Sequence, residues 1–293
     1  MTVADTVLSG PDGEVRIGDV HPFAIIGERI NPTGRKMLSE QMRTGDMTMV
    51  MADAIAQVAA GARILDINAG VPGFDEAEML STAVKSVQSV VGVPLCIDSS
   101  TPSALEAAIP LAQGKVLINS VTAERESMER LLPLVARFGA AVIGMSNDEE
   151  GPQMDPQKRL AAARKIVEAA ADHGIPREDV IIDVVAMPIG AMPEAGRAMY
   201  ETIRLVREEL GCNVSCGASN ISFGMPGRQE IDTAFLSMAV LAGMNTAITN
   251  PMHRSVRKAM LATDVLLGKD EYGSGWIADH RRETDAAKSS SET

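Results

Sequence analysis

The chain has 293 residues and a formal net charge of −12, and only 3% of its residues are aromatic. The negative charge disfavours binding to a phosphate backbone, and the scarcity of aromatic side chains disfavours stacking on single-stranded nucleic acid. The sequence contains no run of 18 apolar residues and does not begin with a basic segment followed by an apolar one. These features predict a cytoplasmic protein that binds neither nucleic acid nor membranes.

The cysteines and histidines give no metal-binding pattern. Cys212 and Cys216 are four residues apart on a predicted strand, so they share a face but lie about 13 Å apart. That distance is too long for two ligands of one tetrahedral ion. The four histidines are not spaced with carboxylates in a metal-ligand pattern either. We therefore expect no metal site.

The chain divides into three parts by composition. Residues 1–22 are polar and glycine-rich, and we expect an N-terminal extension that forms a short hairpin or lid over one end of the fold. Residues 23–268 alternate short apolar runs with amphipathic segments, as expected for one continuous α/β domain. Residues 269–293 are polar, so they are expected to form a disordered tail.

The central part repeats one pattern, an apolar strand followed by an amphipathic helix. The predicted strands cover residues 23–27, 63–68, 94–98, 115–119, 140–145, 179–183, 212–216 and 245–249. The predicted helices cover residues 46–60, 75–91, 102–112, 125–138, 156–173, 199–210, 229–242 and 254–267. Eight such repeats without a linker predict a single (β/α)8 barrel, and an open doubly wound sheet is the structural alternative.

Polar residues follow most of the predicted strands. The active site of a (β/α)8 barrel lies at the carboxyl ends of its strands. The polar residues at those positions are Glu28, Asn31, Asp66, Asn68, Asp98, Asn119, Asp183, Ser219, Asn220, Thr249 and Asn250. Any one of them could instead cap a helix or form a turn. As a set, carboxylates and amides suit a ring that presents adjacent N–H donors and C=O acceptors, such as a guanine or a pterin.

Several of these residues lie in motifs that resemble those of the pterin-binding methyltransferases. The motifs are Gly27-Glu28-Arg29-Ile30-Asn31, Leu65-Asp66-Ile67-Asn68-Ala69-Gly70, Leu95-Cys96-Ile97-Asp98-Ser99, Ile118-Asn119-Ser120, Ile182-Asp183 and Gly217-Ala218-Ser219-Asn220-Ile221-Ser222. The resemblance covers residues 23–268 in order, and this family has a (β/α)8 barrel of the dihydropteroate-synthase-like type. It includes the methyltetrahydrofolate:corrinoid protein methyltransferases and the folate module of cobalamin-dependent methionine synthase.

The resemblance implies a role for each of seven residues. Asp98 and Asp183 are expected to hold the pyrimidine edge of the pterin, and Asn119 to contact its ring. Asn220 matches an asparagine that forms a hydrogen bond near N5, so Asn220 and Asp183 are the expected catalytic residues. The full set expected to bind the folate is Asn31, Asn68, Asp98, Asn119, Asp183, Asn220 and Arg228.

The implied activity is methyl transfer between N5 of tetrahydrofolate and the cobalt of a corrinoid protein, in a demethylation or one-carbon pathway. The chain lacks an Asp-x-His-x-x-Gly cobalamin motif, so the corrinoid is expected on a partner protein that docks at the strand ends. The resemblance also implies a homodimer.

Two alternatives to this activity stay open. Dihydropteroate synthase has Ser-Arg-Lys-Ser in the seventh-strand loop, where this chain has Ser219-Asn220-Ile221-Ser222 and lacks both cations. A non-catalytic folate-binding barrel would need only Asp98, Asn119 and Asp183.

Overall fold

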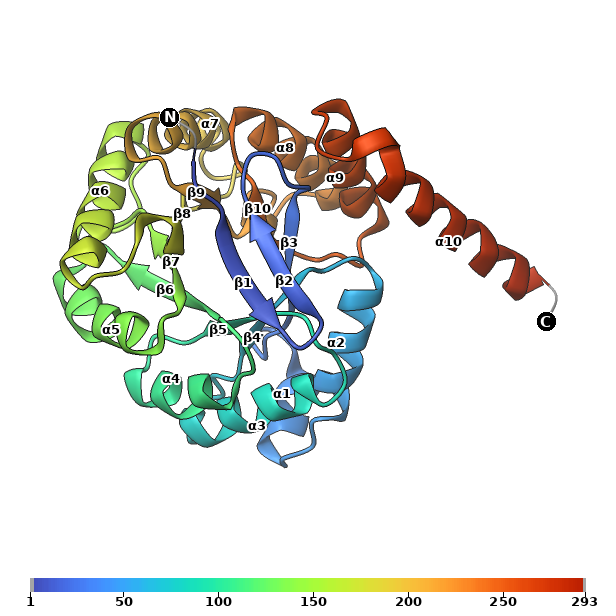
Figure 1. The fold of residues 1–293 in the computed structure, drawn as a ribbon, viewed down its shortest axis with the longest axis horizontal. Helices are drawn as coiled ribbons and strands as arrows, with labels where there is room; N and C mark the ends of the chain where they lie inside the picture. Colours follow the sequence, from blue (N-terminus) through green and yellow to red (C-terminus); the bar gives the residue numbers. More distant parts are fainter. Residues whose placement is uncertain (1–2, 292–293) are drawn as a thin grey trace.

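The computed structural model describes residues 3–291 and contains a parallel barrel surrounded by helices (Figure 1). Its eight-stranded sheet has the order β10-β3-β4-β5-β6-β7-β8-β9. The strands are β3 (Ala24–Ile30), β4 (Ile64–Asn68), β5 (Leu95–Asp98), β6 (Leu117–Thr122), β7 (Ala141–Met145), β8 (Val180–Asp183), β9 (Asn213–Ser215) and β10 (Thr246–Thr249). The two ends of the sheet meet where the backbone N–H of Ile248 donates to the Cys216 carbonyl at 2.9 Å. The predicted (β/α)8 barrel is confirmed.

Amphipathic helices cover the outside of the barrel. They are α1 (Lys36–Arg43), α2 (Thr48–Ala59), α3 (Glu76–Gln88), α4 (Pro102–Ala108), α5 (Arg125–Phe138), α6 (Pro156–Asp172), α7 (Ala195–Leu205), α8 (Arg228–Ala242) and α9 (Arg254–Leu266). In α3, for example, Leu80, Val84 and Val87 are fully buried on one face, and Asp75 caps the helix start. Within residues 3–291, no helix is both long enough and apolar enough to cross a membrane.

One short helix was not predicted. α1 follows β3, in the segment where the sequence indicated only a polar loop. Its buried residues, Leu38 and Met42, are one helical turn apart and pack into the main core. Two apolar positions are too few to give a recognisable helical period, so packing against the barrel determines this helix.

A two-stranded antiparallel hairpin lies across one end of the barrel (Figure 1). It consists of β1 (Thr6–Gly10) and β2 (Gly13–Ile17). Leu8, Val15 and Ile17 are buried in a core cluster with residues that line the barrel interior. The hairpin therefore extends the barrel core beyond the strands themselves.

Backbone contacts identify the end that the hairpin covers. The backbone N–H of Ser9 donates to the carbonyl of Lys115, just before β6, at 3.1 Å. That of Asp12 donates to the carbonyl of Gly92, just before β5, at 2.9 Å. Both acceptors precede strands, so the hairpin covers the amino-terminal end of the barrel and leaves the carboxyl ends uncovered.

Asn213 anchors the hairpin to the barrel, and its replacement by alanine should destabilise the fold. Its side chain is 1% exposed, and Nδ2 lies 3.1, 2.9 and 3.0 Å from the Ala4 carbonyl, the Thr6 hydroxyl and the Ile17 carbonyl. Leaving buried acceptors without a donor costs about 1–3 kcal/mol each. We expect Asn213→Ala to lower the free energy of unfolding by about 3 kcal/mol, measured by urea denaturation. Glu14→Ala, on an exposed part of the hairpin, is the control, and equal stability of the two variants would contradict the anchoring role.

The expectation of a disordered C-terminal tail at 269–293 is wrong for most of that segment. Residues Ser274–Ser291 form α10, which projects away from the barrel (Figure 1). The Asp270 carboxylate accepts hydrogen bonds from the backbone N–H groups of Gly275 and Trp276, each at 3.0 Å. This side chain fixes the first turn of the helix.

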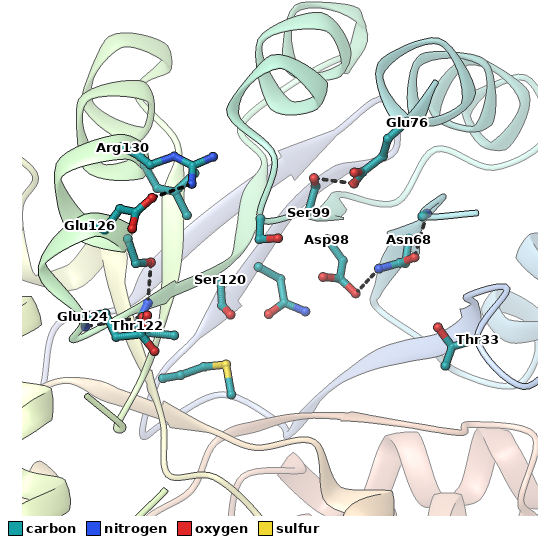
Figure 2. A pocket seen from close by; sticks show the side chains of 16 residues that line it. Thr33, Asn68, Glu76, Asp98, Ser99, Ser120, Thr122, Glu124, Glu126 and Arg130 are labelled. Atoms are coloured by element: carbon teal, nitrogen blue, oxygen red, sulfur yellow. Dashed lines mark hydrogen bonds and ion pairs between the residues drawn. The ribbon is translucent and has the colours of Figure 1, made fainter. Parts of the chain in front are cut away.

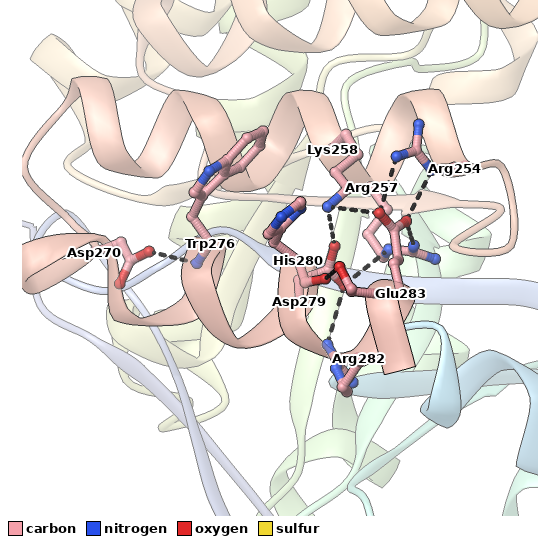
Figure 3. Close-up of polar contacts among 10 residues, drawn as sticks. Arg254, Arg257, Lys258, Asp270, Trp276, Asp279, His280, Arg282 and Glu283 are labelled. Atoms are coloured by element: carbon pink, nitrogen blue, oxygen red, sulfur yellow. Dashed lines mark hydrogen bonds and ion pairs between the residues drawn. The ribbon is translucent and has the colours of Figure 1, made fainter. Parts of the chain in front are cut away.

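Ion pairs, rather than an apolar face, hold α10 against α9 (Figure 3). Asp279, whose side chain is 3% exposed, lies 3.2 Å from Arg257 and 2.5 Å from Lys258. Glu283 lies 2.8 Å from Arg254 and 2.7 Å from Arg257. These pairs join residues more than twenty positions apart, so the polar composition of the segment did not reveal them.

Candidate active site

The carboxyl ends of the barrel strands surround a cavity of about 510 Å³, here called the central cavity. It brings together five of the seven residues predicted to bind the folate. These are Asn31, Asp98, Asn119, Asp183 and Asn220. The parallel register explains this, because Asp98 pairs with Asn119 on the next strand, and Asp183 ends β8 on the far side.

A second cavity, of about 630 Å³, adjoins the first on the side of α5 and is shown in Figure 2. Asp98 and Asn119 line both cavities, so the two share part of one wall. On its outer side, Glu126 and Arg130 of α5 form an ion pair at 3.2 Å (Figure 2). The sixth predicted residue, Asn68, lines this second cavity rather than the central one, at the side away from α5 (Figure 2).

A third cavity, of about 540 Å³, lies on the side of α8 and is here called the α8-side cavity. Arg228, the seventh predicted residue, is the first residue of α8 and lines this cavity rather than the central one. Glu28, Arg29 and Ser219 line both. Arg228 therefore stands beside the central cavity, behind the loop that carries Asn220.

Asp98 is held by its neighbour on β4. The Asn68 amide donates to Asp98 Oδ2 at 3.0 Å, and the Asn68 carbonyl oxygen accepts from the Gly70 N–H at 3.0 Å (Figure 2). Burial raises the pKa of Asp98 to about 6, and the charge of Glu76 adds to this rise, while the Asn68 hydrogen bond opposes it. This carboxyl is ionised at neutral pH and has an oxygen available for a ligand.

Asn119 is oriented by a deeper carboxyl. Its amide donates to Asp66 Oδ1 at 3.1 Å, and Asp66 is 3% exposed. Burial, reinforced by the charge of Asp98, holds the pKa of Asp66 well above its usual value. Asp66 thus positions Asn119 from below, while the rest of the amide faces the cavity.

Asp183 is a buried carboxyl at the end of β8. Its Oδ1 accepts from the backbone N–H of Val185 at 2.7 Å, and its side chain is 7% exposed. Burial raises the pKa of Asp183 to about 6, while backbone hydrogen bonds from Val185 and Gly217 and the charge of Arg159 oppose this rise. Like Asp98, it is mostly ionised at pH 7 and can accept from N–H donors.

Asn220 lies on a short 3-10 turn, Ala218–Asn220, directly after β9. A Cβ built at Gly217 would lie 3.0 Å from Asn220 Nδ2, so the side-chain amide packs closely against this glycine. Gly224 has a φ of +79°, which favours glycine at the far end of the loop. Asn220 itself is exposed to the cavity.

Ser219 in this loop and Glu28 on β3 were absent from the predicted folate-binding set. Ser219 Oγ lies 3.0 Å from both carboxylate oxygens of Glu28, and the Ser219 carbonyl accepts a hydrogen bond from Arg228. Arg228 Nε also donates to Ser222 Oγ at 3.0 Å. Glu28 and Ser219 both stand at predicted strand ends, which was the signal available for finding them. Among residues 3–291, no group of three or more His, Cys, Asp or Glu side chains is placed to hold a metal ion.

Comparison with known proteins identifies the family. The model described as "Pterin binding enzyme" matches residues 27–250. A methylcorrinoid:tetrahydrofolate methyltransferase from Eubacterium limosum is 33% identical over 254 residues, which is 84% of this chain and 92% of the relative. Methionine synthase from Mycobacterium tuberculosis is 29% identical over 257 residues, 80% of this chain but only 22% of that protein.

Solved structures agree on the fold. Dihydropteroate synthase from Xanthomonas albilineans with 4-aminobenzoic acid has a TM-score of 0.68 and 18% identity, over 89% of this chain and 98% of that chain. The enzyme from Thermus thermophilus in complex with 6HMPPP has a TM-score of 0.61 and 23% identity, over 89% of this chain and 99% of that chain. At these identities the likeness concerns the barrel alone. The family match and the sequence relatives together place this chain in the family of pterin-binding enzymes.

Proposed function

We propose that this protein transfers a methyl group between N5 of tetrahydrofolate and the cobalt of a corrinoid. In support, the Eubacterium limosum relative is named a methylcorrinoid:tetrahydrofolate methyltransferase. The observation that carries the proposal is the central cavity, which Asp98, Asn119 and Asp183 line together with Asn220. Dihydropteroate synthase is the less favoured alternative, because the loop offers Asn220-Ile221 where that enzyme has an arginine and a lysine.

The carboxylates suit the pyrimidine edge of a pterin. That edge presents adjacent N–H donors, and an ionised carboxylate accepts such donors in charge-assisted hydrogen bonds. Asp98 and Asp183 are preorganised by Asn68 and Val185, so they need little rearrangement to bind the ring. Asn119 both donates and accepts, which suits a ring whose edge alternates the two.

Asn220 acts on N5 in this proposal. When methyltetrahydrofolate gives up its methyl group, the C–N bond breaks and N5 gains electron density. A hydrogen bond to N5 that strengthens as this happens stabilises the transition state more than the ground state. Asn220 stands on an exposed turn beside the cavity, where its amide can reach the bound ring.

The corrinoid is the second substrate and is carried by another protein in this proposal. The partner would dock over the carboxyl ends of the strands, the end that the β1–β2 hairpin leaves open. A homodimer and a cytoplasmic location complete the proposal, and its metabolic setting is a demethylation or one-carbon pathway.

A methyl-transfer assay tests the proposed function. The purified protein is mixed anaerobically with tetrahydrofolate and methylcob(III)alamin, and separately with 5-methyltetrahydrofolate and cob(I)alamin, while the cobalamin spectrum is recorded. We expect protein-dependent exchange of the methyl group in both directions. Calorimetric binding of 5-methyltetrahydrofolate without transfer would support a non-catalytic folate-binding barrel. Condensation of p-aminobenzoate with a pterin pyrophosphate would instead support dihydropteroate synthase.

A further inference from the structure

Glu28 joins the central cavity to the α8-side cavity. It lies on β3, lines both cavities and is partly exposed to them. Its carboxylate accepts a hydrogen bond from the hydroxyl of Ser219, the residue immediately before Asn220. Glu28 thus contacts the residue next to Asn220, the side chain proposed to act on N5.

The other carboxyls of the central cavity accept hydrogen bonds from groups outside the Ser219–Asn220 segment. Asp98 is held by Asn68 on β4, and Asp183 by the backbone at the end of β8. Asp66 lies beneath Asn119. Among the described contacts, the one hydrogen-bond donor to the Glu28 carboxylate is the Ser219 hydroxyl, which can rotate. Glu28 can therefore take up a proton without breaking hydrogen bonds to fixed groups.

Resting on the proposed function, we propose that Glu28 is the general base that takes the proton from N5 when tetrahydrofolate is methylated, and the general acid that returns it in the reverse reaction. In the forward direction, the N5 lone pair forms the new N–C bond. The Co–C bond breaks, and its electron pair stays on cobalt. The N5–H bond then gives its proton to a Glu28 carboxylate oxygen and leaves its electrons on nitrogen.

The surroundings of Glu28 suit this role. Burial raises its pKa, and the charge of Asp232 adds to the rise, while the Ser219 hydrogen bond and the charges of Arg29 and Arg228 oppose it. A base whose pKa is shifted toward neutral pH transfers protons more effectively than an ordinary carboxylate. The other titratable or charged groups that line the two cavities are Arg35, Asp66, Asp98, Asp183, Glu230 and His253.

The α8-side cavity provides a route by which the proton can leave. It is lined by Asp232, which is 3% exposed and has Oδ1 buried without a hydrogen-bond partner, and by His253 at the start of α9. A proton on Glu28 can therefore pass to this side without crossing the space occupied by the pterin.

Replacing Glu28 with glutamine tests the assignment. Glutamine can still accept from Ser219 but cannot take a proton. We expect the single-turnover rate of methyl transfer from methylcob(III)alamin to tetrahydrofolate to fall about 100-fold at pH 7, the lower end of the range for general acid–base catalysis. The pH dependence of the rate that comes from titration of Glu28 should disappear in this variant. The Kd for folate should stay within about twofold of the wild-type value. Glu201→Gln, an exposed carboxyl on α7, is the control.

A second variant separates proton transfer from a structural effect. Glu28→Ala leaves space at this position, so added formate should restore at least a tenfold gain in rate. An unchanged rate and pH profile in Glu28→Gln would overturn the proposal. So would a folate Kd that rises as much as the rate falls, or a slow Glu28→Ala that formate does not rescue. Absence of turnover in the wild type would instead reject the proposed function itself.

Discussion

Asn220→Ala should slow methyl transfer by about 10²–10³-fold, the typical effect of removing one donor aimed at developing charge. The amide is expected to bond N5 most strongly as the C–N bond breaks, so its loss raises the barrier rather than weakening ground-state binding. Calorimetry should therefore find a Kd for 5-methyltetrahydrofolate within about threefold of the wild-type value. The rate is measured in single turnovers with cob(I)alamin, which removes any effect on partner docking.

Gln157→Ala provides a matched control for Asn220→Ala, because Gln157 is an exposed amide at the start of α6. It should change neither the rate nor the affinity. Equal losses of rate and affinity in Asn220→Ala would show that Asn220 merely binds the substrate. A rate unchanged from wild type would show that the amide does not act on N5.

Much of the fold could be predicted because each barrel unit carries its own local signal. Most strands are apolar runs, and most helices carry one apolar stripe. The predicted strand at 94–98 and the observed β5, Leu95–Asp98, differ by a single residue. Parallel pairing then brings the strand ends to one edge, which is why Asn68, Asp98 and Asn119 occupy adjacent positions on β4, β5 and β6.

The features that escaped prediction depend on contacts between distant parts of the chain. Glu28 and Ser219 are separated by 191 residues, and neither position alone indicates a hydrogen bond. The docking of α10 depends on the ion pairs of Asp279 with Arg257 and Lys258. Such pairs cannot be predicted from the spacing of apolar residues in the sequence. The hydrogen bonds of Arg228 to Ser219 and Ser222 were not predicted either, and its contact with the folate stays a prediction.

Asp183→Ala should weaken 5-methyltetrahydrofolate binding by at least about 100-fold, since hydrogen bonds to a charged group contribute about 1.5–3 kcal/mol each. The carboxylate is fixed by the Val185 N–H and largely buried, and a water molecule in the vacated space would lack its negative charge. Isothermal titration at pH 7.5 measures the loss, and circular dichroism checks that the variant is folded. Binding as tight as that of the wild type would contradict the role of Asp183.

The pH dependence of folate binding gives an independent check on both carboxyls. Burial raises the pKa of Asp98 and of Asp183 to about 6. The folded protein therefore takes up protons at these sites as the pH falls through 6. If the pterin binds the ionised forms, its affinity is full above about pH 7 and falls below pH 6 by up to tenfold per unit for each carboxyl. In Asp98→Asn, Asp183 is the one of these two carboxyls that still titrates, so the slope of log Kd against pH should fall from about two protons toward one. An affinity that stays constant between pH 5 and pH 8 would mean that neither carboxylate has to be ionised to hold the ring.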